Sequence, residues 1–187
     1  MPVALRSRRF TADEYQRMGQ VGILSEDDRV ELIDGEVLAM TSIGPRHCAA
    51  VDRATRTFVT AAGERAIVRV QGAVRLNLYT EPEPDLLLLR PRADFYASAH
   101  PGPADVLLVV EVDDSSIGYD RDVKAFIYAH SGVPEYWLVD LNDSVLVRHL
   151  RPEGGAYRIV EPIASACSIA PSLLPDCLIA VADLIAR

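Results

Sequence analysis

The sequence predicts one domain of the α/β (α+β) class that covers residues 1–187, with its core between about residues 10 and 185. Two unbroken apolar runs, at 86–89 and 106–110, indicate strands that are buried on both faces. Other segments, in which apolar residues recur at helical intervals, lie before and between the expected strands. A chain of 187 residues, 49% hydrophobic and 25% charged, is long enough for one sizeable core.

The first third of the chain is expected to form two helices and a hairpin. Thr11 and Glu14 have the spacing of a capping box, which predicts a short helix that ends near Gly19. The dipeptide at 34–35, Asp-Gly, accepts the positive φ values of a two-residue turn, so strands are expected at 30–33 and 36–40. Pro45 suits the first position of a long helix that continues to residue 62 and packs on the sheet.

The rest of the chain is expected to be mostly strands, at 66–70, 73–78, 85–90, 106–112, 135–141, 144–150 and 156–163. A surface loop is expected at 91–104, because this stretch is rich in proline and has no sustained period. Helices are expected at 120–130 and at the C-terminus. On the helix at 120–130, the packing face is expected to include Val123, Phe126, Ile127 and His130.

Composition argues against several classes of protein. The 19 Lys+Arg and 27 Asp+Glu residues give a net charge of −8, which speaks against a broad basic surface but leaves room for a local basic groove. Three cysteines without a CxxC pair indicate neither a zinc knuckle nor a disulfide framework, which suits a reducing cytoplasm. No export segment or membrane anchor is expected, because the apolar runs are too short to span a bilayer.

Two acids stand at the ends of the buried strands: Asp85 starts one and Glu111 ends the next. If these strands are adjacent, the two carboxylates meet in a low-dielectric site and repel each other, unless a divalent cation lies between them. Mg²⁺ or Mn²⁺ suits such a site, which the carbonyl of Val112 could complete. The pair is therefore the candidate metal site, although Asp85 taken alone could be only a strand cap.

The lone lysine of this region, Lys124, supplies a third element. Asp120, Lys124 and Tyr128 share one face of the expected helix, so Lys124 could point back at the strand end. An ammonium there can position a metal-bound water or offset charge on an attacked phosphate, which suits phosphodiester hydrolysis. Taken alone, Lys124 could instead form a solvated pair with Asp120, and Tyr128 could belong to the core with its hydroxyl at the rim.

Several segments together resemble the Uma2 family of restriction-endonuclease-like proteins, within the PD-(D/E)xK nuclease superfamily: ELIDGE, EPEPDLLLL, VVEV, DSSIGYDRDVK and GVPEYWLVD. The resemblance spans residues 10 to 185. It implies a restriction-endonuclease-like fold, with a mixed central sheet flanked by helices, and a divalent-metal nuclease site. It also puts Asp85 and Glu111 in the places of the two acids of the motif.

This sequence departs from the motif at one position. The motif has a lysine two residues after its second acid, and here Asp113 stands two residues after Glu111. The family's habit of taking the lysine from the following helix points to Lys124. Glu31, in ELIDGE, matches an additional acidic position and is a fourth candidate catalytic residue. His47 matches a further family position and joins Asp120 and Tyr128 as a supporting residue. Glu31 could alternatively pair with Arg29 or Arg46, and His47 could be a packing residue.

The expected function is a divalent-metal-dependent endonuclease that hydrolyses phosphodiester bonds in DNA, in which a twofold homodimer would let one site meet each strand. Two other classes stay open. One is a non-catalytic binding or regulatory module on the same fold, and the other is a metal-dependent hydrolase of a small phosphoester. The positions of the arginines should discriminate between these functions, because binding of a nucleic-acid backbone requires several positive charges beside Asp85. The candidates are Arg46, Arg53, Arg56, Arg69, Arg75, Arg90 and Arg92.

Overall fold

The computed structural model of the protein describes residues 7–25, 27–40, 42–114 and 119–185, apart from the side chains of residues 119–122. The helices and strands within these ranges are α1 (Ala12–Gln20), β1 (Val30–Ile33), β2 (Glu36–Ala39), α2 (Pro45–Ala62), β3 (Ile67–Val70), β4 (Leu86–Leu89), β5 (Val106–Asp113), α3 (Tyr119–His130), β6 (Glu135–Asp140), β7 (Val145–Glu153), β8 (Ala156–Ile163), β9 (Ser168–Ile169), β10 (Ile179–Ala180) and α4 (Val181–Ile185). Short 3₁₀ turns occupy Gly63–Arg65 and Pro103–Asp105.

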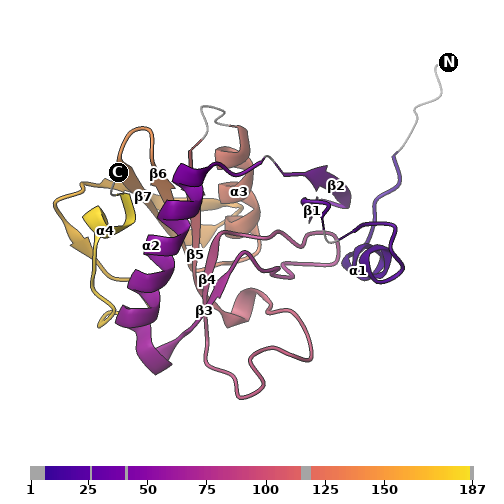
Figure 1. Ribbon diagram of the computed structural model, residues 1–187, viewed down its shortest axis with the longest axis horizontal. Helices are drawn as coiled ribbons and strands as arrows, with labels where there is room; N and C mark the ends of the chain where they lie inside the picture. The colour runs from indigo at the N-terminus through magenta and orange to yellow at the C-terminus, as the bar shows by residue number, and fades with distance from the viewer. Residues whose placement is uncertain (1–6, 26, 41, 115–118, 186–187) are drawn as a thin grey trace.

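Six strands form one mixed sheet in the order β3-β4-β5-β6-β7-β8 (Figure 1). Strands β5 and β6 are parallel and are connected through α3, whereas the other neighbours are antiparallel. The two apolar runs of the sequence form β4 and most of β5, and their leucines and valines are buried. The predicted mixed central sheet flanked by helices is confirmed.

The sheet has a hydrophobic cluster on each face. On one face, α2 and α4 pack against alternate residues of β4 to β6, including Leu86, Leu108 and Trp137. On the other face, Tyr128 and Ala129 of α3 pack against the intervening residues, including Leu87 and Val109. Successive residues along β4, and from Leu108 to Val110 of β5, therefore enter different clusters, which explains why these stretches carry no polar face.

The N-terminal lobe, formed by α1, β1 and β2, lies at one end of the molecule (Figure 1). Its helix begins at the predicted capping box between Thr11 and Glu14, and its hairpin turns at Asp34 and Gly35 with φ values of 50° and 80°. Two backbone hydrogen bonds join Leu32 of β1 to Glu81, at 3.3 and 2.8 Å. The hairpin is thereby fixed beside the segment that leads into β4.

Two predictions of local structure were wrong. Residues 73–78 are not a strand, because Val74 and Leu76 donate backbone hydrogen bonds to Pro82 and Thr80 after the chain turns back on itself. On α3, Phe126 is 55% exposed and His130 is exposed, whereas Tyr128 is fully buried. The expected apolar face is therefore rotated toward Tyr128, whose ring contacts the sheet.

Among the helices of the described ranges, none combines the length and the apolar character needed to cross a bilayer.

Candidate active site

Strand pairing brings the two predicted acids together. Because β4 and β5 are antiparallel, with Leu86 opposite Val110, the start of one strand lies beside the end of the other. The backbone amide of Asp85 donates a hydrogen bond to Oε2 of Glu111 at 3.3 Å. β4 and β5 are thus adjacent, as the sequence suggested, and the two acids lie at the same end of this strand pair.

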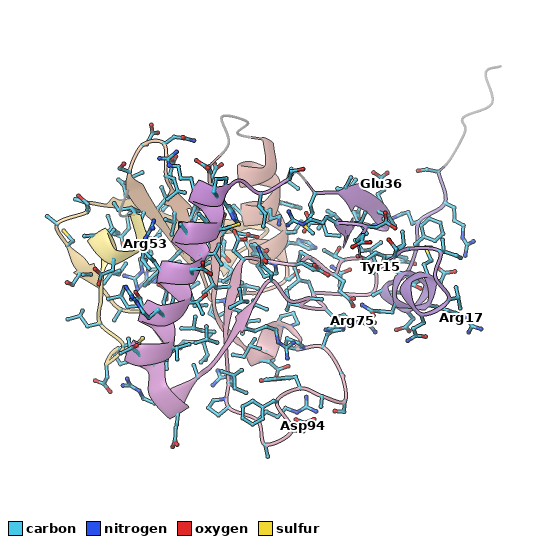
Figure 2. All side chains as sticks on the ribbon, viewed as in Figure 1. Tyr15, Arg17, Glu36, Arg53, Arg75 and Asp94 are labelled. Atoms are coloured by element: carbon cyan, nitrogen blue, oxygen red, sulfur yellow. The ribbon has the colours of Figure 1, made fainter. Side chains whose placement is uncertain are left out.

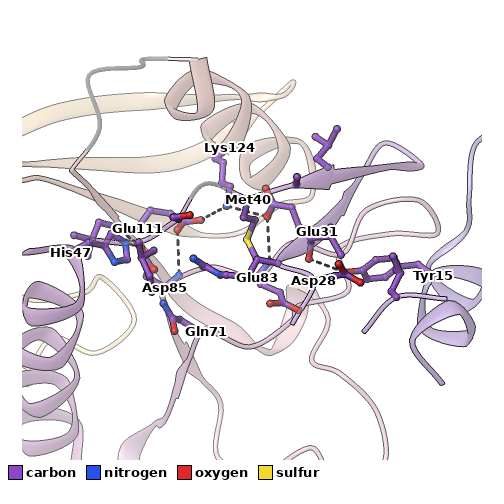
Figure 3. A pocket seen from close by; sticks show the side chains of 18 of the residues that line it. Tyr15, Asp28, Glu31, Met40, His47, Gln71, Glu83, Asp85, Glu111 and Lys124 are labelled. Carbon is purple, nitrogen blue, oxygen red and sulfur yellow. Dashed lines mark hydrogen bonds and ion pairs between the residues drawn. The ribbon is translucent and has the colours of Figure 1, made fainter. Parts of the chain in front are cut away.

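The carboxylate of Asp85 is buried, with 9% of the residue exposed, and is fixed from two sides. Its Oδ2 accepts a hydrogen bond from the amide of Val112 at 2.9 Å and lies 3.1 Å from Nε2 of His47, near the start of α2 (Figure 3). Among the described residues, both of these contacts use Oδ2, which leaves Oδ1 available to a cation or a water.

His47 is oriented by Asp85. The hydrogen bond with this carboxylate raises the pKa of His47 above its ordinary value, against the opposing effect of burial. Because an ionised carboxylate oxygen only accepts, Nε2 donates the proton in this hydrogen bond, and the buried Nδ1 has no partner within the described part of the chain.

Glu111 is the centre of a second set of contacts. Its Oε1 accepts hydrogen bonds from Nζ of Lys124 at 3.1 Å and from the hydroxyl of Tyr128 at 2.7 Å. Burial raises the pKa of Glu111 to about 7, with Lys124 opposing this rise and Asp85 adding to it. Burial also raises the pKa of Tyr128 well above its ordinary value, so its hydroxyl stays a donor.

Glu31 reaches the same place from the N-terminal lobe. Its Oε2 lies 3.1 Å from Nζ of Lys124, and it accepts a longer hydrogen bond from the amide of Glu83 at 3.4 Å. Burial disfavours the charged form of Lys124, but the carboxylates of Glu111 and Glu31 outweigh it and raise the pKa of the ammonium. Lys124 therefore links the hairpin to the sheet.

Three other residues considered from the sequence lie around this site. Arg46, the alternative partner of Glu31, bonds instead to Asp114 at 2.6 Å and to Asn142 at 3.1 Å. Asp113, at the usual position of the motif lysine, lines the same cleft as Glu111. Asp120 lies in the first turn of α3, and its side chain is outside the described part of the structure.

A cleft of about 1430 Å³ lies between the N-terminal lobe and the sheet, and its lining includes Glu31, His47, Asp85, Glu111, Asp113 and Lys124. The charged side chains described in its lining are mostly acidic: Asp28, Glu31, Glu83, Asp85, Glu111, Asp113 and Asp114, against Arg29, Lys124 and the titratable His47. Such a lining attracts cations and disfavours a polyanion unless cations are bound first.

The arginines singled out from the sequence do not converge on Asp85. Arg75 pairs with Glu81 at 2.8 Å and with Asp13 at 2.6 Å, and it does not belong to the lining of the cleft. Arg69 and Arg92 both lie over the ring of Tyr96. Figure 2 shows Arg53 and Arg75 in separate regions of the molecule. The local basic groove that the net charge left possible is therefore not formed beside Asp85 by these arginines, none of which lines the cleft.

The donor set fits a hard divalent cation. No group of three or more His, Cys, Asp or Glu side chains within the described ranges is arranged to hold a metal ion. Mg²⁺ nevertheless needs only one or two carboxylates, because it keeps several of its waters, whereas structural zinc sites need four protein ligands. Asp85 and Glu111 supply two carboxylates at the cleft wall, which suits Mg²⁺ or Mn²⁺ and not structural zinc.

Sequence reasoning missed Glu83, which lines the cleft two residues before Asp85. Burial raises the pKa of Glu83, and the nearby carboxylates of Glu31 and Glu81 act in the same direction. The EPEPD segment at 81–85 could have indicated it, because side chains two positions apart in an extended segment point to the same side, and Glu83 is two positions before Asp85.

Comparisons with known proteins identify the family of this chain and a solved structure with a similar fold. Residues 12–182 match the family model described as "Uma2: Putative restriction endonuclease". A crystal structure titled as a "putative nuclease" from Anabaena variabilis ATCC 29413 has a TM-score of 0.72 at 16% sequence identity, and the match covers 94% of this chain and 97% of that one. At this identity the likeness shows a shared fold. No curated protein gives a significant match.

Proposed function

This chain belongs to the Uma2 family of restriction-endonuclease-like proteins, and on that premise we propose that it is a divalent-metal-dependent endonuclease that hydrolyses phosphodiester bonds in DNA. The observation that carries the proposal is the convergence of two carboxylates and one ammonium on one wall of a cleft; they come from the residue before β4, from β5 and from α3. Metal-assisted phosphodiester hydrolysis needs this combination of hard oxygen ligands and positive charge.

In the proposed mechanism, Asp85 and Glu111 hold the cation. A divalent ion bound there would supply Lewis-acid charge to the phosphate and lower the pKa of a coordinated water. His47 and the amide of Val112 fix the carboxylate of Asp85, so that its second oxygen stays directed to the cleft. The hydroxyl of Tyr128 and the amide of Asp85 hold Glu111 in the same way.

Lys124 is the proposed catalytic cation of the protein itself. Its ammonium offsets the negative charge that builds up on the attacked phosphate, and its place beside Glu111 would let it orient the attacking water. Because Asp113 stands where the motif usually has lysine, this role would pass to α3. DNA substrate binding in a twofold dimer would give each strand its own cleft.

A second candidate function is hydrolysis of a small phosphoester or nucleotide by the same residues. The acidic lining of the cleft and the dispersed arginines favour it, because a small substrate needs fewer phosphate contacts than a duplex. The two functions share a metal site and differ in substrate size.

Purified protein incubated with supercoiled plasmid, and in parallel with bis(p-nitrophenyl) phosphate, tests both. With Mg²⁺ or Mn²⁺ the wild type should nick or linearise plasmid, and Asp85→Asn should not. Asp176→Asn is the matched control, because Asp176 is 85% exposed and pairs only loosely with Arg65, at 3.7 Å. Turnover of the small ester without plasmid cleavage would favour the second function, and inactivity on both substrates would contradict both.

A further inference from the structure

We infer that the ammonium of Lys124 takes the place of a second cation, so that the centre uses one divalent ion and Glu31 acts as a positioning residue that holds the ammonium against Glu111. This inference rests on the proposed metal site at Asp85 and Glu111, and it assigns a separate task to each oxygen of Glu111.

The two oxygens of Glu111 face different partners. Oε2 faces the backbone amide of Asp85, the other residue that would hold the ion, at 3.3 Å, and Oε1 faces Nζ of Lys124 at 3.1 Å. A carboxylate that bridges two cations in a two-metal centre is used in this way, with one oxygen for each charge. In this protein the ammonium of Lys124, beside Oε1 of Glu111, occupies the position of the second cation.

Glu31 completes that second position. Its Oε2 lies 3.1 Å from the same Nζ, so the ammonium sits between carboxylates that come from β1 and β5, which are far apart in the sequence. All three side chains are largely buried, with exposed fractions of 16% for Lys124, 10% for Glu31 and 13% for Glu111. Two buried carboxylates this close to one point repel each other unless a cation lies between them or one of them takes up a proton.

The residue type fits this role. Lys124 is the only lysine in the chain, and the other eighteen basic residues counted as Lys+Arg are arginines. Arginine also forms the buried ion pairs with Glu81 and Glu135. An ammonium is a compact point charge, comparable to a metal ion between two carboxylates, whereas a guanidinium is a planar fork that needs more room.

The test counts bound Mn²⁺ ions per chain, by calorimetric titration and by electron paramagnetic resonance of free Mn²⁺. Lys124→Met should bind one ion more than the wild type, and Lys124→Met/Glu31→Gln should lose that additional ion. Arg158→Met is the matched control: it removes one positive charge from an exposed pair with Glu153, whose side chains are 60% and 68% exposed, and it should add no ion.

The same number of ions in Lys124→Met and in the wild type would overturn the inference, as would an additional ion that survives Glu31→Gln. Asp85→Asn, measured separately, reports on the proposed metal site: loss of the wild-type ion supports that site whatever the Lys124 variants do. If Lys124→Met is unfolded without cations, circular dichroism recorded during the Mn²⁺ titration shows whether the bound ions refold the chain. Refolding with one Glu31-dependent ion supports the inference, and an unfolded chain at saturating Mn²⁺ refutes it.

Discussion

The buried charge of Lys124 should make a large contribution to stability when no metal is present. Lys124→Met leaves the carboxylates of Glu31 and Glu111, only 10% and 13% exposed, without their shared counter-ion. Breaking a buried ion pair by removing one partner costs about 3–5 kcal/mol of unfolding free energy. In a chain of this size, each 1 kcal/mol lowers the melting temperature by about 2–4 °C, so a fall of roughly 6–20 °C is expected.

The loss of stability in Lys124→Met should depend on pH, and the direction of this dependence follows from the titration of Glu111. Burial raises the pKa of this carboxyl in the folded protein to about 7, above its ordinary value of 4.5. The folded state therefore binds the proton more tightly, and stability from this group is lost as the pH rises from 4.5 through 7. Removal of the ammonium raises this pKa further, so the penalty of Lys124→Met should be greatest at pH 8 and smaller at pH 6, where Glu111 takes up a proton.

Urea unfolding in EDTA, followed by the fluorescence of the single, fully buried Trp137, measures both effects. Arg158→Met is the control and should stay within about 0.5 kcal/mol of the wild type, because it removes an exposed pair. A cost below about 1 kcal/mol at pH 8, the range of a surface ion pair, would refute the reasoning, as would an equal cost at pH 6 and pH 8.

Three further predictions concern the proposed metal site. Asp85→Asn should weaken Mn²⁺ binding by more than about 100-fold in calorimetry, since loss of an outer-shell partner alone costs 10–100-fold; unchanged affinity would rule Asp85 out as a ligand. Mn²⁺ affinity of the wild type should fall by up to about tenfold per pH unit below 7, because the ion must displace the proton of Glu111, and a flat profile from pH 5 to 7 would contradict this. Lys124→Ala should lower turnover by about 10²–10³-fold with little loss of Asp85-dependent metal affinity. Adding Asp113→Lys should restore part of that turnover, and undiminished activity of Lys124→Ala would count against its role.

Local chemistry was enough to predict many elements of this protein. The capping box at Thr11, the turn at Asp34-Gly35 and the helix start at Pro45 depend on a few neighbouring residues, and each is found as expected. The adjacency of Asp85 and Glu111 was also accessible, because strands that follow each other in the sequence usually pair. The family resemblance then supplied the meaning of these two acids, which their spacing alone did not.

Tertiary structure decided what depends on distant segments. The apolar pattern of residues 73–78 gave no sign that the backbone amides of Val74 and Leu76 bond to residues 80–82, and burial of these two side chains satisfies that pattern without a strand. The rotation of α3 toward Tyr128 likewise follows from the cluster on the sheet face that it covers.

The same distinction holds within the site. Sequence alone identified Glu31, Glu111 and Lys124 as candidates, but not that one ammonium lies between both carboxylates. That contact requires the N-terminal lobe to be fixed against the segment before β4, which the paired backbone hydrogen bonds of Leu32 and Glu81 accomplish. The dispersal of the arginines has a similar origin, because packing brings Asp13 to Arg75 and Asp114 to Arg46 from distant parts of the chain.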